Sequence, residues 1–291
     1  MKTLVYAAPE KVEVREMPVP EPKEGQVRIR VSYCGICGSD IGIFAGKHPR
    51  AKAPLVLGHE FIGTIDAING GSGKFNVGDR VSAYPLLSCG HCFACKTGIP
   101  HVCQTLKLIG IDVDGGIAEY VTCDEDVLFK IDEAVSDKAA AVIEPLAVIV
   151  RTMHQANFQT RDTAAVIGAG PIGLLAAMAA LAYGAEPIVI DVVDERLEFA
   201  RELGVRYTIN SAAQDVVQKV SEYTKGRMAE LVMECSGANA AVRSTLDIVS
   251  NAGRITLTGW PKKETPLPTD AITRKEVDIR GARTSANEFE E

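Results

Sequence analysis

The chain has 291 residues, of which 46% are hydrophobic and 24% are charged. These fractions are typical of a globular protein and exclude disorder, a collagen-like repeat or a coiled coil as the overall description. The 31 basic and 38 acidic residues give a net charge of −7, which argues against nucleic acid or an anionic membrane as the main partner. This length predicts two domains.

The N-terminal residues lack the long apolar core of a signal peptide, so we expect a cytoplasmic protein. In a reducing compartment, the eight cysteines are not expected to form a disulfide framework. Residues 164–185 carry no charge and could span a bilayer by length, but glycines interrupt their first half. A strand, a glycine turn and a buried helix explain this stretch better.

The first half of the chain is predicted to be rich in strands. Apolar and β-branched residues alternate in several short segments between turn-forming loops. Four strands are expected, at residues 27–36, 60–68, 79–87 and 117–123. Residues 135–154 have a helical pattern on either side of Pro145, where we expect a break or kink.

After Thr160, strands alternate with helices. The six expected strands lie within residues 163–170, 186–193, 206–210, 228–237, 253–260 and 277–284. This alternation predicts an α/β domain with a doubly wound parallel sheet of six strands. Residues 286–291 resemble the first turn of another helix.

Four cysteines gather in one short segment: Cys89, Cys92, Cys95 and Cys103. Four thiolates at these spacings can close a tetrahedral shell around one zinc ion, which predicts a structural site with no open position. An iron–sulfur cluster also uses four cysteines. Alternatively, His91 or His101 could replace one sulfur.

A glycine pattern follows the first strand of the second half and opens an apolar helix. The sequence IGAGPIG contains Gly168, Gly170, Pro171, Ile172 and Gly173. Glycines there permit a tight turn and close approach of a pyrophosphate, which the N–H groups at the start of the helix can bind.

The end of the next strand carries Asp191, which can accept hydrogen bonds from a ribose hydroxyl and would repel a 2′-phosphate. The pattern therefore predicts NAD rather than NADP. Arg196 weakens this preference, because a nearby arginine can accept the phosphate.

A dispersed set of residues offers a second metal site: Cys37, Ser39, Asp40, His59, Glu60 and Glu144. A thiolate, an imidazole and a carboxylate with one open position describe a catalytic zinc site. Asp40 is a candidate acceptor for the second N–H of the ligand histidine. Cys34 and Cys37 also form a C-x-x-C pair, but the surroundings lack the order of elements of a thioredoxin-like fold.

Several motifs follow one another along the chain in this order: GHEFIGTI, GDRV, the four-cysteine loop, DGGIAEYV, the dinucleotide turn, ECSG and GRITLTG. In this order the chain resembles the zinc-dependent medium-chain dehydrogenases, specifically their polyol, sorbitol and threonine dehydrogenase branch. The resemblance implies a GroES-like catalytic domain at 1–150 and an NAD-binding Rossmann domain at 151–285. It also implies a catalytic zinc on Cys37 and His59, completed by Glu60 or Glu144. Ser39 would relay the alcohol proton.

The sequence departs from that family in two ways. Gly42 stands where many members carry a relay histidine, so proton exit must use water or the ribose hydroxyls. Family members usually continue beyond residue 291 with a tail that returns to the catalytic domain. We therefore expect either a piece of a longer protein or poor turnover.

Together with the motifs, the resemblance implies a homo-oligomeric, NAD-dependent dehydrogenase that oxidises a secondary alcohol to a ketone. A polyol or sugar alcohol is the expected substrate, and an amino alcohol such as threonine is an alternative. The contrasting hypothesis is a zinc- and NAD-binding structural or regulatory protein without turnover. Trp260 and Arg283 follow the last two strands, whose ends face the ligand crevice in this fold, so Arg283 is a candidate substrate contact.

Overall fold

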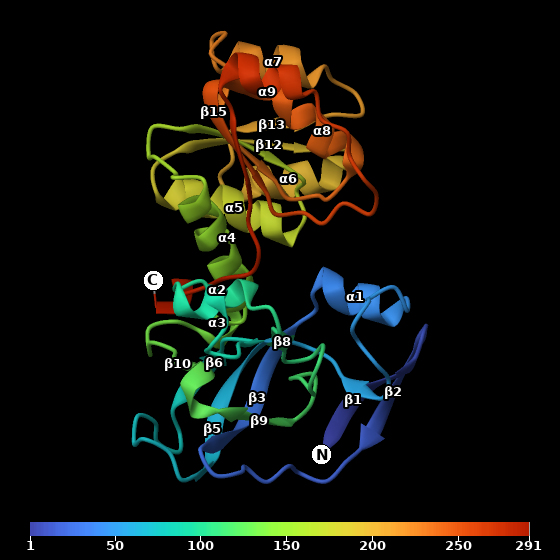
Figure 1. Ribbon diagram of the computed structural model, residues 1–291, viewed down its shortest axis with the longest axis vertical. Helices are drawn as coiled ribbons and strands as arrows, with labels where there is room; N and C mark the ends of the chain where they lie inside the picture. The colour runs from blue at the N-terminus through green and yellow to red at the C-terminus, as the bar shows by residue number, and fades with distance from the viewer. Residues whose placement is uncertain (291) are drawn as a thin grey trace. The chain divides into compact units, whose positions relative to one another are not determined.

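The computed structural model describes residues 1–290 and divides into two compact units (Figure 1). Unit 1 comprises Met1–Glu144 and the end of the chain from Ala286, and unit 2 comprises Pro145–Ser285. The division expected from the sequence, at residue 150, lies in the same helix, α4 (Ile143–Gln155). The end of the chain forms a 3-10 turn at Glu288–Glu290, and the expectation for residue 291 lies outside the described residues.

Unit 1 is rich in strands, as the alternating segments predicted, and these strands pair antiparallel. A five-stranded sheet has the order β10-β6-β5-β3-β9. Its strands are β3 (Gln26–Gly35), β5 (Glu60–Asn69), β6 (Arg80–Ala83), β9 (Tyr120–Asp124) and β10 (Leu128–Lys130). Its inward-facing side chains, among them Ile29, Phe61 and Val81, form one apolar core.

Two strands at the N-terminus were not predicted. β1 (Lys2–Ala8) and β2 (Lys11–Glu16) form a hairpin, and β1 also pairs with β4 (Leu55–Val56). The expected strand at 79–87 is wrong in its second part. It breaks at Pro85, which has no N–H for a ladder, and β7 (Leu86–Leu87) pairs instead with β8 (Lys107–Leu108).

The expected break at Pro145 is also wrong. The helical segment is interrupted earlier, between α3 (Asp137–Ala140) and α4. Pro145 is the third residue of α4, where its backbone nitrogen would have no intrahelical partner in any case, so the helix continues through it.

Unit 2 confirms the six-stranded parallel sheet, with the order β13-β12-β11-β14-β15-β16. The strands are β11 (Thr163–Ile167), β12 (Glu186–Asp191), β13 (Tyr207–Asn210), β14 (Ala229–Glu234), β15 (Val249–Leu257) and β16 (Asp278–Gly281). The order reverses between β11 and β14, and a doubly wound sheet binds its ligand at the carboxyl ends of the strands at that point.

Helices cover both faces of this sheet because successive strand residues point to opposite sides. Val166 and Met233 face one cluster, whereas Ile167 and Val232 face the other. The first cluster includes residues of α4, α5 (Pro171–Ala182) and α6 (Asp194–Glu202). The second includes residues of α7 (Val216–Tyr223), α8 (Asn239–Ile248) and α9 (Thr269–Lys275), the last of which was not predicted.

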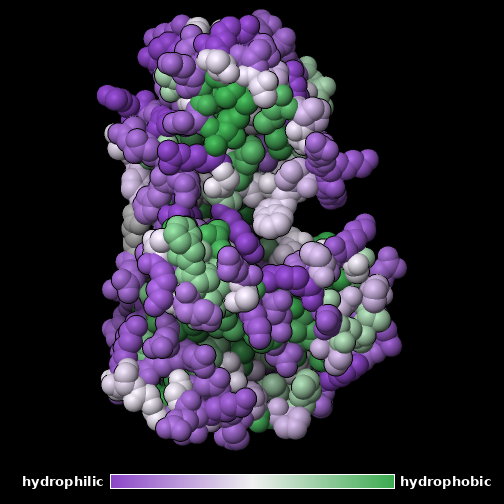
Figure 2. Space-filling view, in the orientation of Figure 1, coloured by the Kyte–Doolittle hydropathy of each residue, from purple (hydrophilic) through white to green (hydrophobic). Residues whose placement is uncertain are grey.

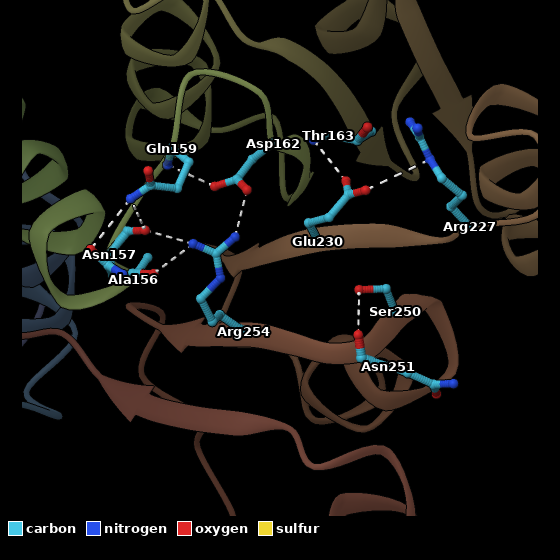
Figure 3. A network of polar contacts seen from close by, with 10 residues as sticks. All are labelled: Ala156, Asn157, Gln159, Asp162, Thr163, Arg227, Glu230, Ser250, Asn251 and Arg254. Atoms are coloured by element: carbon cyan, nitrogen blue, oxygen red, sulfur yellow. Dashed lines mark hydrogen bonds and ion pairs between the residues drawn. The ribbon is translucent and has the colours of Figure 1, made fainter.

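A partly buried ion pair joins the loop after α4 to the sheet (Figure 3). The Arg254 guanidinium on β15 lies 2.5 Å from Asp162 Oδ1 and donates to the carbonyl oxygens of Ala156 and Asn157 at 3.2 and 2.6 Å. Asp162 Oδ2 accepts from the Gln159 backbone N–H at 2.8 Å. These bonds hold the segment between α4 and the start of β11.

The face of each unit that Figure 2 shows is mostly hydrophilic, with smaller hydrophobic areas. The apolar stretch 164–185 forms β11, the glycine turn and α5, as predicted. No helix within residues 1–290 has the length and apolar character required to cross a bilayer.

Candidate metal centres and cofactor site

The four clustered cysteines converge in unit 1. Cys92 Sγ lies 3.5 Å from Cys95 Sγ and 3.8 Å from Cys103 Sγ, and Cys89 Sγ lies 3.9 Å from Cys95 Sγ. A tetrahedral zinc ion with Zn–S bonds of about 2.3 Å holds its sulfurs about 3.8 Å apart. The spacing therefore fits one zinc ion between four thiolates and leaves little room for a multi-iron cluster.

Backbone N–H groups support this arrangement. The N–H of Cys89 donates to Cys103 Sγ, and the N–H of Cys92 donates to Cys89 Sγ, each at 3.4 Å. Donation from the backbone of His91 and Cys92 lowers the pKa of Cys89 to about 6, which favours the thiolate that a metal requires. The His91 side chain is exposed, and its Nδ1 lies 2.7 Å from the Cys89 carbonyl oxygen.

The second metal group is assembled from three separate segments of unit 1. Cys37 is the N-cap residue of α1 (Gly38–Phe44), His59 lies between β4 and β5, and Glu60 begins β5. One ligand atom from each of these three residues lies within 4.8 Å of the others. Glu144, the second residue of α4, is not in this group, but its carboxylate interacts electrostatically with His59 and Glu60.

Two further predicted residues lie on α1. Asp40 Oδ2 accepts the Cys37 backbone N–H at 2.8 Å, which forms part of a capping box and fixes the ligand loop. Its expected hydrogen bond with His59 is not formed among the described residues, and the two groups interact through charge. Ser39 is half-buried, two residues after Cys37.

This group fits a cation. Within residues 1–290, the buried atoms His59 Nδ1 and Asp40 Oδ1 have no hydrogen-bond partner. Burial raises the pKa of Cys37 to about 12 and that of Glu144 to about 7, and it also raises the pKa of Glu60. Buried acidic groups that gather in this way are stabilised by a divalent ion, and the donors are those of a catalytic zinc site.

The glycine turn in unit 2 has the geometry that dinucleotide binding requires. Gly168 has φ +102°, and a Cβ there would lie 2.9 Å from Ser236 Cβ. A Cβ at Gly173 would collide with the Gly168 carbonyl oxygen. Gly170 caps α5 with open space around it, and Pro171 occupies the first helical position, followed by Ile172. The free N–H groups in the first turn of a helix can bind a phosphate, and the open space around Gly170 is compatible with this role.

Asp191 ends β12, as predicted, and is 8% exposed. Its carboxylate accepts backbone N–H groups from Ala169 at 2.6 Å, from Val192 at 2.8 Å and from Val193 at 3.0 Å. An ionised carboxylate has about four acceptor positions, so it retains capacity for a ribose hydroxyl. Arg196 Nη1 lies 3.8 Å from Asp191 Oδ2, which places its cation beside the same position.

Sequence reasoning missed Glu234, at the end of β14. Its side chain is fully buried, and its carboxylate accepts the backbone N–H of Ser236 at 2.9 Å and of Gly237 at 3.0 Å. Its backbone carbonyl accepts the N–H groups of Thr258 and Gly259. Glu234 therefore joins the loops after β14 and β15. The signal in the sequence that could have identified Glu234 is the presence of a charged residue within an otherwise apolar strand.

The comparisons with known proteins agree with this arrangement. The family model described as alcohol dehydrogenase GroES-like domain matches residues 23–133, and that described as zinc-binding dehydrogenase matches residues 171–291. An uncharacterized zinc-type alcohol dehydrogenase-like protein of Haemophilus influenzae is 44% identical over 100% of this chain and 85% of its own length. The chain belongs to the zinc-type alcohol dehydrogenase family. The predicted resemblance is thereby confirmed.

Named relatives include polyol dehydrogenases. The sorbitol dehydrogenase of Halalkalibacterium halodurans is 38% identical over 93% of this chain and 80% of its own length. The D-arabitol-phosphate dehydrogenase of Enterococcus avium is 34% identical over 92% and 78%, respectively. Members of this group are oxidoreductases, and this zinc-type dehydrogenase shares their enzyme class.

Solved structures show the same fold. RspB of Escherichia coli CFT073, complexed with NADH, has a TM-score of 0.92 and 36% identity and covers 100% of this chain and 85% of its own. Galactitol-1-phosphate dehydrogenase of Escherichia coli has a TM-score of 0.94 and 31% identity, with coverage of 100% and 87%. A zinc-binding dehydrogenase of Sinorhizobium meliloti, bound to NADP, has a TM-score of 0.95 and 27% identity, with coverage of 99% and 85%.

Proposed function

We propose that this dehydrogenase oxidises a secondary alcohol of a polyol or sugar alcohol to a ketone, with NAD as hydride acceptor. The observation that carries the proposal is the convergence of Cys37, His59 and Glu60 in one unit, together with the Gly168–Gly173 turn and Asp191 in the other. Zinc on the first group would supply a Lewis acid that lowers the pKa of the alcohol.

The residues of unit 1 take distinct roles in this proposal. Cys37, His59 and Glu60 hold the zinc, and Glu144 adds negative charge beside it without entering the group of close ligand atoms. Asp40 fixes the Cys37 loop through the backbone N–H. Ser39 accepts the alcohol proton, and with Gly42 in place of a side-chain relay the proton leaves through water or a ribose hydroxyl. The four-cysteine group holds the structural zinc.

The choice of NAD rests on the Asp191 carboxylate, which is fixed by three backbone N–H groups and would repel a 2′-phosphate. Arg196 beside it leaves some capacity for NADP. A polyol substrate is supported by the polyol dehydrogenases among the relatives, and threonine is the second candidate because another relative is a threonine dehydrogenase. No observation favours a structural or regulatory protein without turnover. A homo-oligomer in the cytoplasm stays our prediction.

The test is a panel of polyols and L-threonine assayed with NAD⁺ and with NADP⁺, together with zinc analysis of the same preparation. The proposal expects turnover of at least one polyol with NAD⁺ and two zinc ions per chain. Turnover of primary alcohols alone would contradict the substrate class. Full activity without zinc would contradict the mechanism.

A further inference from the structure

The strand β2 forms the outer edge of the N-terminal sheet in unit 1, whose order is β2-β1-β4 (Figure 1). Within residues 1–290, β2 pairs with β1 alone, and all but one of its residues are exposed. Val14, near the middle of the strand, is 72% exposed. An exposed edge strand presents free backbone groups and is a template for pairing with another chain. The N-terminal hairpin therefore offers a surface for association.

The outward direction of the β2 backbone follows from its pairing with β1. Leu4 of β1 bonds away from β2, because its N–H donates to the Ile117 carbonyl oxygen at 2.9 Å. Leu4 lies opposite Val14 in the register of the hairpin. Opposite residues of an antiparallel pair share one hydrogen-bonding direction, and this direction alternates along each strand. Val14 therefore points its N–H and C=O away from β1, as do Val12 and Glu16.

One antiparallel register of two β2 strands satisfies both the backbone and the charges. With a two-fold axis at Val14, this residue lies opposite its own copy, and both offer outward backbone groups, as in a hydrogen-bonded pair. The same register places Glu13 opposite Arg15 of the second copy, and Arg15 opposite its Glu13. Within one chain, Arg15 Nη2 already lies 2.7 Å from Glu13 Oε2. The two copies would therefore form a ring of alternating charges.

Other registers of the same strand are less favourable. A two-fold axis at Glu13 or at Arg15 places that residue opposite its own copy, so like charges meet. An axis at Val12 overlaps only three residues of the strand, because β2 begins at Lys11. The axis at Val14 overlaps five residues. The sequence of β2 thus favours a single self-complementary register.

The hairpin also contacts the helix that follows the first metal ligand. Its turn residue Glu10 donates its backbone N–H to the Phe44 carbonyl oxygen, at the end of α1, at 2.6 Å. Pro9 packs against Gly46, where an added Cβ would lie 2.8 Å from Pro9 Cβ. The helix α1 begins directly after Cys37. A contact that orders the hairpin therefore also restrains the far end of α1.

We infer that β2 is an interface with a second copy of this chain, paired antiparallel about Val14, and that this pairing stabilises α1 in each copy. The inference does not depend on the substrate of the enzyme, and it gives a surface to the homo-oligomer that we predict. The partner is the same chain rather than another protein, because the favoured register is self-complementary in backbone and in charge.

Disulfide trapping tests the register on the zinc-loaded full chain. Opposite Cα atoms of a hydrogen-bonded pair lie about 5.5 Å apart, which a disulfide can span. Val14→Cys should therefore form a covalent dimer under oxidised glutathione on a non-reducing gel, with the parent and its eight cysteines as the blank. Val12→Cys is the matched control and should stay monomeric, because its two copies would lie about 14 Å apart along the strands. A monomer with Val14→Cys, or an equal yield of dimer with Val12→Cys, would overturn the inference.

Charge reversal tests the pairing by a second route. Glu13→Arg and Arg15→Glu each place like charges opposite one another, so the assembly should halve in mass at protein concentrations at least about 10-fold above those at which the parent does so. The double variant Glu13→Arg/Arg15→Glu restores opposite charges and should assemble like the parent. Glu133→Arg makes the same charge change as Glu13→Arg at an exposed residue outside β2 and should have no effect.

Sedimentation across a dilution series measures the mass of each assembly. Single variants that assemble like the parent would overturn the inference, and so would a double variant that assembles as weakly as the single ones.

Hydrogen exchange measures whether the pairing supports α1. Peptides that cover residues 38–46 should exchange at least about 10-fold faster in Glu13→Arg than in the parent, at a concentration where only the variant is dissociated. The double variant should show the rate of the parent, and peptides of α7 in unit 2 should not change in any of the three. Equal exchange of α1 in the assembled and dissociated proteins would overturn the second part of the inference.

Discussion

The carboxylate of Glu60 fills the space beside Gly35 that a side chain at position 35 would need. A Cβ atom added to Gly35 would collide with Glu60 Oε2 and would lie 3.1 Å from Glu60 Cβ. The two residues face each other across the paired strands β3 and β5. Glycine at position 35 therefore allows Glu60 to reach Cys37 and His59.

We predict that Gly35→Ala displaces Glu60 and weakens the catalytic zinc site. Zinc content should fall toward one ion per chain, and kcat should fall at least about 10-fold, because a mispositioned ligand costs more than 1.4 kcal/mol. The control is Gly42→Ala on α1, where an added Cβ meets nothing within 4 Å. If Gly35→Ala retains both zinc ions and full activity, Glu60 is not a ligand.

Loss of a ligand from the four-cysteine group should lower the stability of the protein rather than alter its chemistry. Cys95→Ser is expected to lose one zinc ion and to lower the melting temperature, because binding of a structural zinc contributes directly to folding. Metal analysis and calorimetry measure both effects. His91→Ala is the matched control and should keep the zinc, because its side chain is exposed and contacts a backbone oxygen. An unchanged melting temperature in Cys95→Ser would contradict the assignment.

Substitutions in the metal group of unit 1 should affect turnover without affecting cofactor binding. Cys37→Ala and His59→Ala are each expected to abolish turnover while changing the NADH dissociation constant less than about two-fold, because the proposed dinucleotide site, the glycine turn and Asp191, lies in unit 2. Glu144→Ala should be milder, since Glu144 lies outside the close ligand group. Activity assays and NADH titration decide between these outcomes. Turnover by His59→Ala would refute the zinc mechanism.

Much of the fold followed from local patterns. The alternating strands β3, β5 and β9 and the six parallel strands have strong periodicity, and the glycine turn has a distinct steric requirement at Gly168. The β1–β2 hairpin escaped prediction because its exposed outer strand lacks a buried face. The position of Pro145 in the first turn of α4 depends on where that helix begins, which a helical pattern does not specify.

The candidate site was predictable by residue type and not by geometry. Cys37, His59 and Glu60 were identified by their chemistry, but their convergence requires the pairing of β3 with β5. Sequence alone did not show whether Glu60 or Glu144 is the zinc ligand. The two side chains are chemically identical, and only their places in the fold distinguish them. The roles of Gly35 and Glu234 depend on close packing between segments and leave little trace in a single sequence.

Cofactor preference should depend on the charge of Asp191. Asp191→Asn is expected to lower kcat/KM with NAD⁺ relative to kcat/KM with NADP⁺, reducing this ratio by at least about 10-fold, since the repulsion of a 2′-phosphate is lost. Asparagine retains one oxygen for the backbone N–H groups, whereas glycine would also remove the support of the turn. Arg196→Gln should reduce the remaining use of NADP⁺. A constant ratio in Asp191→Asn would exclude the proposed role.

The last prediction concerns Glu144 and pH. Burial raises the pKa of Glu144 to about 7, with attraction to His59 opposing it and repulsion from Glu60 adding to it. Its ordinary value is 4.5, so the folded protein without catalytic zinc binds more protons than the unfolded chain between these two values. The contribution of Glu144 to stability must therefore fall as pH rises from 4.5 to about 7, by at most about 3 kcal/mol.

Glu144→Gln removes this titration. After removal of the catalytic zinc by a chelator, with the four-cysteine zinc verified by metal analysis, the variant should gain stability over the parent as pH rises from 5 to about 8. Bound zinc should reduce the difference, because a cation favours the carboxylate. Urea unfolding at each pH measures the effect. Parallel stability curves for the parent and Glu144→Gln would show that Glu144 is ionised throughout this range and is not held in a desolvated position beside the metal group.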